Sequence, residues 1–271
     1  MKNKNQKKSG TGIINRLFKE GITDDITTEL ATMAETAEEV VYDHTKKLVS
    51  TVVDYKELMM MYGCAIKEIQ TKFEILNSEF NVRYQRNPIS SVSTRLKRAA
   101  SIADKLDRRN LPFTLESIEE NINDVAGVRV ICSYIDDIYR IADAFLQQED
   151  ITLVARKDYI SDPKPNGYRS LHLIVKVPVF FVNWKKEIKV EVQIRTIAMD
   201  FWASLEHQLK YKQNIPHQES IISQLKTCAD AIAATDQKML DIRNQIEEMA
   251  DTPTNEDILF EKLSRLDVAV Y

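Results

Sequence analysis

A short stretch, PKPNGYRSLH at residues 163–172, combines a rigid turn with residues suited to holding a planar, phosphorylated ligand. Pro165 fixes its own φ, and the Asn166-Gly167 pair tolerates positive φ, so the stretch predicts a stiff turn that leads into a strand. The turn carries an aromatic ring, a guanidinium and an imidazole, at Tyr168, Arg169 and His172. Pro-Asn-Gly turns are also common on protein surfaces, so the turn alone leaves a plain surface turn open.

A second stretch, KVEVQIR, alternates polar and apolar residues with the period of a strand. One face carries Lys189, Glu191, Gln193 and Arg195, and the other carries Val190, Val192 and Ile194. Helical regions flank this part of the chain, so we expect the polar face to line a cavity. The alternative is an edge strand whose polar face is solvated.

The helix expected over residues 196–211 continues this pattern. Its polar stripe holds Asp200, Ser204, His207 and Tyr211, and its apolar stripe holds Phe201, Trp202, Leu205 and Leu209. The strand and the helix are joined without a long loop, so the two polar stripes can face one pocket. His207 taken alone fits a structural, hydrogen-bonded imidazole better than a catalytic one.

Positive charge gathers in residues 93–109, which we expect to form a helix that begins at Ser91 or Ser93 and closes before Pro112. One face would hold Arg95, Arg98, Lys105 and Arg109, and the adjacent face Lys97, Ser101 and Arg108. Such a face is either simply solvated or a groove for polyphosphate, where guanidinium groups match phosphate oxygens.

Two carboxylates complete the candidate chemistry. Asp124 precedes the strand expected at 125–134, and with Glu191 it would form a pair suited to Mg²⁺, whose other ligands are phosphates and water. Arg129 lies five residues after Asp124, so an ideal strand would send the two to opposite faces. Either Asp124 lies before the strand proper or Gly127 marks a bulge.

The elements that must position these residues follow from the hydrophobic period. We expect two long helices over 23–83, strands at 125–134, 151–158, 171–177 and 187–195, a helix at 136–148, and helices at 196–211, 217–250 and 255–266. This order predicts an α+β fold, a mixed sheet flanked by helices, with helical N- and C-terminal extensions.

Bulk composition limits the classes of function. The 271-residue chain has a net charge of −4, so any phosphate site must be local. Its cysteines, Cys64, Cys132 and Cys228, show no CxxC spacing and argue for a reducing compartment rather than disulfides or a zinc site. The basic N-terminus lacks the apolar core of a signal peptide, and no apolar run is long enough to span a membrane. We therefore expect a cytoplasmic protein without membrane contact.

Taken together, these residues resemble the synthetase domain of the RelA/SpoT family, and within it the short branch of small alarmone synthetases. The resemblance lies in VSTRLKRAASIADK, NDVAGVRVICSYIDDIYR, ARKDYISDPKPNGYRSLHLIV and VEVQIRTIAMDFWASLEHQLKYK, in the order of the family. It implies a nucleotidyltransferase-like sheet and a pyrophosphokinase. Such an enzyme moves the β,γ-diphosphate of ATP to the 3′-hydroxyl of GDP or GTP and makes ppGpp or pppGpp and AMP in the stringent response.

The resemblance also implies roles for single residues. Asp124 and Glu191 match the carboxylates that bind Mg²⁺, and Glu191 is the candidate to accept the proton of the 3′-hydroxyl. On the ATP side the matching or neighbouring residues are Arg95, Lys97, Ser101, Lys105, Arg109, Arg129 and Lys157, with Arg95 and Arg129 on the two faces of adenine. On the GTP or GDP side, Tyr168 would stack on guanine, Asp200 would read its N1 and N2 donors, and Arg169, His172 and Gln193 would contact ribose or phosphates.

The expected organisation is a disordered basic tail at 1–22, a helical extension at 23–88, the catalytic domain at 89–213 and C-terminal helices at 214–271. The extension would enlarge a helical bundle, make an oligomer contact or bind a regulator. Family members of this length often form homotetramers, and the C-terminal helices are candidates for that packing, as RNA or (p)ppGpp are candidates for regulation. No His-Asp pair occurs, so we expect no alarmone hydrolase activity. Rival hypotheses are a toxic relative that modifies the 3′ end of tRNA and a non-catalytic nucleotide- or RNA-binding regulator.

Overall fold

The computed structural model describes residues 22–210 and 218–249. The chain divides into two compact units, Met1–Leu58 and Met59–Tyr271. The first unit contains the N-terminal part of the long helix α2, Ile22–Tyr84, and the second contains the sheet and the remaining helices. The predicted tail at 1–22, except Ile22 at the start of α2, and the predicted helix at 255–266 lie outside the described residues.

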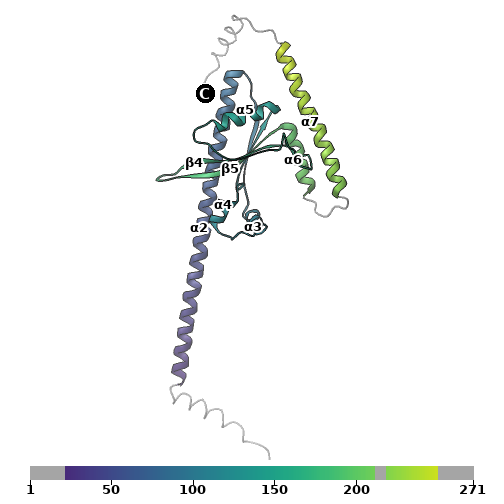
Figure 1. Ribbon diagram of the computed structural model, residues 1–271. Coiled ribbons are helices and arrows are strands. Elements are labelled where there is room, and N and C mark those ends of the chain that lie inside the picture. Colours follow the sequence, from purple (N-terminus) through teal and green to yellow (C-terminus); the bar gives the residue numbers. More distant parts are fainter. Residues whose placement is uncertain (1–21, 211–217, 250–271) are drawn as a thin grey trace, which may run out of the picture. The chain divides into compact units, whose positions relative to one another are not determined.

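A mixed sheet of five strands forms the centre of the second unit (Figure 1). Its strands are β1 (Ile89–Leu96), β2 (Ala126–Cys132), β3 (Thr152–Asp158), β4 (Leu171–Phe180) and β5 (Lys185–Thr196), in the spatial order β1-β2-β5-β4-β3. β2 and β5 run parallel, and the other neighbouring strands pair antiparallel. The α+β prediction is therefore confirmed, and KVEVQIR lies in the central strand.

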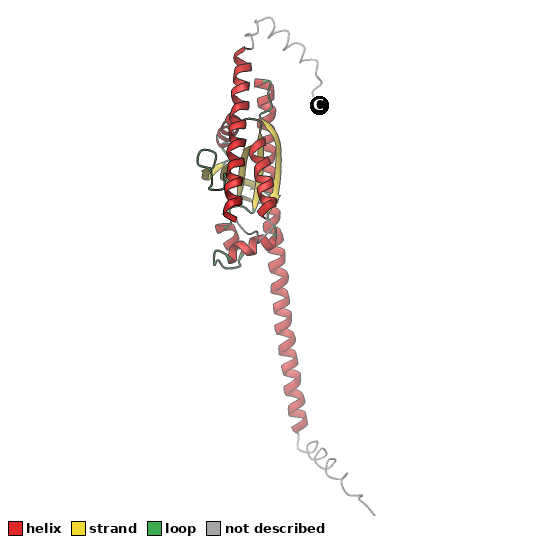
Figure 2. Ribbon diagram, turned by 90° about the vertical axis from the view of Figure 1, so that its right-hand side faces the viewer, coloured by secondary structure: helices red, strands yellow, loops and turns green. Residues whose placement is uncertain are grey.

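Helices cover the apolar face of this sheet, which Figure 2 shows nearly edge-on. Burial alternates along β5 up to Ile194, because Val190, Val192 and Ile194 are fully buried while Glu191 and Gln193 are partly exposed; Arg195, on the polar face, is also buried. On α5 (Ile135–Leu146) the buried Phe145 stacks on Phe73 of α2, with ring centroids 4.6 Å apart. The polar face of β5 thus stands opposite a packed core and is free to face a ligand.

The helix predicted over 93–109 is only partly correct. Residues 89–96 form strand β1, which pairs with β2 and places Ser93 opposite Arg129 and Arg95 opposite Gly127. Helix α3 begins at Ala99 and ends at Asp107. Backbone pairing with β2 thus overrides the helical pattern, and Arg95 stands on a strand instead of the basic helical face.

Two further helices differ from expectation. α2 is one helix rather than two, because Gly63 weakens a helix interior without ending it. α4 (Leu115–Asn121) was not predicted, and its N-cap Thr114 accepts a hydrogen bond from the backbone nitrogen of Ser117 at 3.1 Å. The predicted break near Asn87-Pro88 is confirmed, since α2 ends at Tyr84.

The C-terminal helices are α6 (Ile197–Lys210) and α7 (Gln218–Met249). The side chain of Trp202 on α6 is buried and donates from Nε1 to the carbonyl oxygen of Leu225 on α7, at 3.0 Å. The predicted apolar stripe is otherwise wrong as a packing face, because Phe201, Leu205 and Leu209 are 60%, 43% and 49% exposed. The buried neighbours of Trp202 on α6 are instead Met199 and Ala203.

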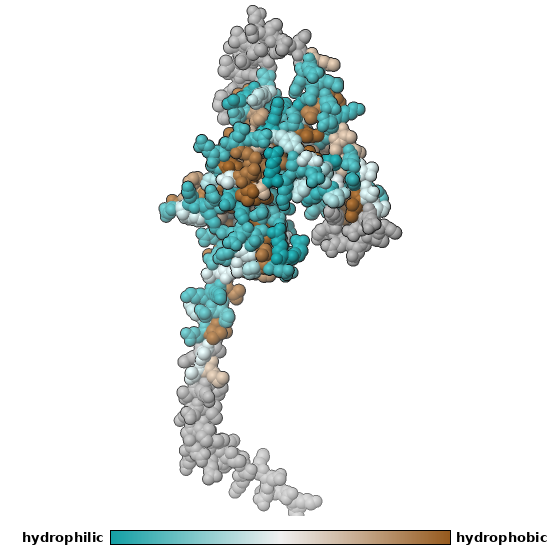
Figure 3. All heavy atoms as spheres, in the orientation of Figure 1, coloured by the Kyte–Doolittle hydropathy of each residue, from teal (hydrophilic) through white to brown (hydrophobic). Residues whose placement is uncertain are grey.

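Hydrophilic side chains cover much of the face shown in Figure 3, with hydrophobic ones in separate patches. No helix among residues 22–210 and 218–249 has the length and apolar character needed to cross a membrane.

Candidate active site

A cavity of about 310 Å³ opens on the polar side of β1, β2 and β5. Its lining consists of Ser93, Thr94, Arg95, Gly127, Val128, Arg129, Glu191 and Gln193. The prediction that the polar face of β5 lines a cavity is therefore confirmed. The volume lies at the lower end of the range typical of small-ligand sites.

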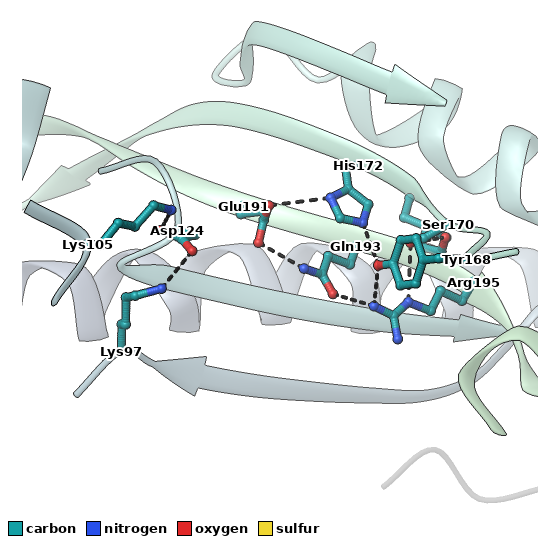
Figure 4. A network of polar contacts seen from close by, with 10 residues as sticks. Lys97, Lys105, Asp124, Tyr168, Ser170, His172, Glu191, Gln193 and Arg195 are labelled. Atoms are coloured by element: carbon teal, nitrogen blue, oxygen red, sulfur yellow. Dashed lines mark hydrogen bonds and ion pairs between the residues drawn. The ribbon is translucent and has the colours of Figure 1, made fainter. Parts of the chain in front are cut away.

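Asp124 lies just before β2, which begins at Ala126. Lys97 Nζ contacts one oxygen of Asp124 at 2.8 Å, and Lys105 Nζ contacts the other at 2.7 Å (Figure 4). Burial raises the pKa of Asp124, but the hydrogen bonds and charges of the two lysines outweigh it and lower that pKa to about 2. Gly127 pairs in regular register with Arg95 and Glu191, so the position of Asp124 before the strand, not a bulge, removes the parity conflict with Arg129.

Glu191 receives a donor on each carboxylate oxygen. Gln193 Nε2 donates to Oε2 at 2.9 Å, and His172 Nδ1 lies 3.4 Å from Oε1. Burial raises the pKa of Glu191, but the contacts with His172 and Gln193 outweigh it, so the net shift is downward. The charge of Asp124 acts in the opposite direction on the same pKa, so the two carboxylates lie within electrostatic reach of each other.

Asp124 and Glu191 are the residues that could hold a divalent cation such as Mg²⁺. Asp124 and Glu191 offer hard carboxylate oxygens, and the described residues contain no group of three or more His, Cys, Asp or Glu that could hold a metal. Two carboxylates suit a cation whose remaining ligands are substrate phosphates and water rather than an all-protein cage.

Tyr168, His172 and Arg195 form a hydrogen-bonded cluster next to Glu191. Tyr168 Oη lies 2.8 Å from His172 Nε2 and accepts a hydrogen bond from Arg195 Nη2 at 2.6 Å. Arg195 Nη2 also donates to Gln193 Oε1 at 2.8 Å. Since His172 and Gln193 both contact Glu191, the five side chains close a ring (Figure 4).

Asp200 joins this ring to the cavity. Its Oδ1 lies 3.2 Å from Arg195 Nη1 and 3.3 Å from Arg129 Nη1. Helix α6 therefore presents a carboxylate between a cavity arginine and the buried arginine of the ring.

The turn before β4 is held against α7. Gly167 has φ of 88°, as the Asn-Gly pair predicts, and a Cβ there would lie 2.5 Å from Ala229 Cβ. Asn166 Nδ2 donates to Glu206 Oε1 at 3.0 Å. Arg169 contacts α7, with Nη1 donating to the carbonyl oxygen of Ala229 at 3.3 Å and Nη2 lying 3.1 Å from Asp230.

The structure thus brings ten of the predicted site residues into the cavity lining or into contact with one another, and shows no such side-chain contact for the other four. Arg95, Arg129, Glu191 and Gln193 line the cavity, and Lys97 and Lys105 hold Asp124. Tyr168 and Asp200 contact Arg195, and His172 links Tyr168 to Glu191. The other four are Ser101, Arg109, Lys157 and Arg169, which neither line the cavity nor form a hydrogen bond or ion pair with Asp124, Glu191 or Arg195. Arg109 donates to the carbonyl oxygen of Asn121 at 2.8 Å, and Lys157 pairs with His172 across β3 and β4.

Arg195 is the residue to which the sequence assigned no role. The alternation of KVEVQIR placed it on the polar face, but only the structure shows that it is buried and surrounded by acceptors.

A cavity lined by two arginines and Glu191, with Asp124 within electrostatic reach of Glu191 and Tyr168 tied to it through His172, has the groups that a nucleotide phosphotransferase needs. A sequence profile described as "Region found in RelA / SpoT proteins" matches residues 94–216. The GTP pyrophosphokinase YwaC of Bacillus subtilis is 43% identical over 204 residues, which are 75% of this chain and 97% of that protein.

Solved structures agree. Small alarmone synthetase 2 of Bacillus subtilis superposes with a TM-score of 0.64 at 44% identity, covering 71% of this chain and 99% of that one. Small alarmone synthetase 1 of the same organism, bound to its product pppGpp, gives 0.65 at 35% identity, covering 72% and 98%. The chain belongs to the RelA/SpoT family, in its branch of small alarmone synthetases.

Proposed function

We propose that this protein is a GTP pyrophosphokinase that transfers the β,γ-diphosphate of ATP to the 3′-hydroxyl of GDP or GTP. The observation that carries the proposal is the position of Glu191, which faces a cavity with two arginines and is tied through His172 to the turn tyrosine. The related structure with pppGpp bound supports a guanosine nucleotide as the acceptor.

Glu191 is the base in this proposal. Its lowered pKa keeps it ionised, so it can accept the proton of the acceptor 3′-hydroxyl. The freed oxygen attacks the β-phosphorus of ATP, the bond from that phosphorus to the α,β-bridging oxygen breaks, and AMP leaves. Mg²⁺ held by Asp124 and Glu191 would neutralise charge on the transferred phosphates when bound.

The remaining side chains divide between the two nucleotides. Arg95 and Arg129 line the cavity and can stack on adenine with their guanidinium planes. Lys97 and Lys105 form ion pairs with Asp124, and their ammonium groups can also bind phosphate oxygens next to it. Tyr168 would stack on the guanine base, and Asp200 would accept hydrogen bonds from its N–H donors.

The proposal extends to the setting of the enzyme. A cytoplasmic location suits its substrates, and a homotetramer with control by RNA or (p)ppGpp follows the earlier expectation for the family. Modification of the 3′ end of tRNA is not favoured, because YwaC is named as a GTP pyrophosphokinase.

The test incubates the protein with γ-labelled ATP and Mg²⁺, adding GMP, GDP, GTP or tRNA separately, and separates the products. Label is expected on GDP and GTP, and label on tRNA alone would contradict the proposal. Glu191→Gln should lose transfer by at least about 100-fold, as removal of a catalytic base does. Glu187→Gln is the matched control, since Glu187 lies on the same strand, its side chain is 60% exposed, and its ion pair with Lys176 is long, at 3.9 Å.

A further inference from the structure

Arg195 is a buried charge in the middle of the candidate site. The residue is 4% exposed, and its side chain contacts four different side chains. These are Tyr168 at 2.6 Å, Gln193 at 2.8 Å, Asp200 at 3.2 Å and Ser170 at 3.3 Å. Burying a guanidinium is costly unless its donors are satisfied, so this position requires arginine for a reason beyond packing.

Two hydrogen-bonded arms run from Arg195 to the same carboxylate (Figure 4). In the first arm, Nη2 donates to Tyr168, whose hydroxyl contacts His172, and His172 contacts Glu191 Oε1. In the second arm, the same Nη2 donates to Gln193, whose amide nitrogen donates to Glu191 Oε2. Both oxygens of Glu191 are therefore oriented by chains that start at one nitrogen.

The chemistry of arginine sets the direction of both arms. A guanidinium can donate but cannot accept, so the Gln193 amide must turn its oxygen toward Arg195 and its nitrogen toward Glu191. The same donation to Tyr168 Oη leaves the hydroxyl proton available for His172 Nε2. The guanidinium carbon also lies 5.1 Å from the centroid of the Tyr168 ring, so it holds the ring as well as its hydroxyl.

We propose that Arg195 is a positioning residue that aligns the Tyr168 ring and the Glu191 carboxylate as one unit. The inference rests on the proposed function, in which Tyr168 binds the acceptor base and Glu191 accepts the acceptor proton. It couples acceptor binding to the orientation of the base, because a displaced Tyr168 also releases one arm. Lysine cannot replace arginine here, since an ammonium lacks the planar fork that reaches several acceptors at once.

The first experiment compares Arg195→Met and Arg195→Lys with wild type in the labelled-ATP assay, and measures GDP binding without ATP by calorimetry. Arg195→Met should lower kcat by about 10- to 100-fold, the usual cost of losing an orienting partner, and weaken GDP binding, with KM for ATP little changed. Arg195→Lys should recover only part of kcat. Wild-type kcat and GDP binding in Arg195→Met would overturn the inference.

Arg243→Met is the matched control. Arg243 is also largely buried, with a side chain 14% exposed, and contacts Asp136 at 2.9 Å and Glu247 at 3.4 Å, away from the cavity lining. This variant should lower the melting temperature and leave kcat and GDP binding unchanged. An equal loss of kcat in both variants would assign Arg195 a purely structural role.

A double-mutant cycle decides whether the residues act through one network. Tyr168→Phe removes the hydroxyl and keeps the ring, so Arg195→Met should cost less kcat in that background than in wild type. Fold losses that simply multiply would overturn the inference. If Arg195→Met does not fold, the cycle of Tyr168→Phe with Gln193→Met tests the two arms with arginine intact, and multiplying losses there would again overturn it.

The measurements on the wild-type protein separate this inference from the proposed function. A wild type that binds GDP but transfers no label contradicts the proposed function, and the effect of Arg195 on GDP binding then decides the inference. A wild type that transfers label while the Arg195 variants behave like it overturns the inference alone.

Discussion

Gly167 lets the turn before β4 pack against α7, and replacing it with alanine should dislodge that turn. Gly167 has φ of 88°, and an added Cβ would lie 2.5 Å from Ala229 Cβ and 3.3 Å from Lys226 Cα. A left-handed conformation costs an L-residue about 1–2 kcal/mol. Overpacking adds about 1–3 kcal/mol. The free energy of unfolding should therefore fall by about 2–5 kcal/mol if the turn keeps its place.

The melting temperature and KM for GDP measure the two consequences. A domain of this size loses about 2–4 °C per kcal/mol, so Gly167→Ala should melt about 4–20 °C lower. KM for GDP should rise, because Tyr168 follows directly in the chain and its ring would move with the turn. Gly63→Ala is the matched control, since no atom lies within 4 Å of its added Cβ, and it should be neutral or stabilising by about 0.5–1 kcal/mol.

A second substitution, at Ala229, separates the steric clash of the added Cβ from the free-energy cost of the left-handed backbone. Ala229→Gly removes the nearest atom, so combining it with Gly167→Ala should restore part of KM for GDP while the left-handed cost remains. Wild-type melting and wild-type KM in Gly167→Ala would refute the view that α7 holds the turn.

Two further predictions concern buried carboxylates of the second unit, Asp137 and Asp236. Arg86→Met should lower the free energy of unfolding in urea by about 3–5 kcal/mol, because it leaves the fully buried Asp137 without its partner at 2.5 Å. Arg83→Met, on the exposed end of α2, should change it by less than about 0.5 kcal/mol, and equal effects would contradict the argument. Burial raises the pKa of Asp236 above its ordinary 3.8 despite the hydrogen bond from Thr196, so native protein binds that proton more tightly than unfolded chain. The stability that this group contributes is present at low pH and is lost as the pH rises from 3.8 through the native pKa. Asp236→Asn should therefore have a higher melting temperature than wild type at neutral pH. A difference in melting temperature that stays constant at all pH values would refute this.

Periodicity predicted the strands in which polar and apolar side chains alternate clearly. β5 is the clearest case, since a period of two fixes which residues face the core and therefore places Glu191 and Gln193 on the cavity side. The same signal failed at β1, whose serines and arginine have no strong strand preference. That segment is a strand because β2 supplies its hydrogen bonds, and a local pattern carries no information about such a distant partner.

Because a local pattern carries no information about distant partners, the packing face of α6 was predicted wrongly and the contacts of Arg195 were not predicted. A helical period shows that Phe201, Leu205 and Leu209 share a face, but it does not show whether another element covers that face. Arg195 lies 27 residues from Tyr168 in the chain, and their contact follows from the antiparallel pairing of β4 with β5. The motif resemblance supplied the residues that match the family, whereas the partners of each residue required the structure.

The two carboxylates of the site are held ionised by different means, and this difference suits different tasks. Lys97 and Lys105 lower the pKa of Asp124 with their full positive charges, and these ammonium groups can bind the phosphates of an incoming nucleotide instead. Glu191 is oriented instead through hydrogen-bonding side chains on its own and the neighbouring strand, which can remain in place while the carboxylate accepts a proton. Asp124 is therefore the carboxylate whose partners should change when ATP binds, and Glu191 is the one whose geometry should stay fixed through transfer.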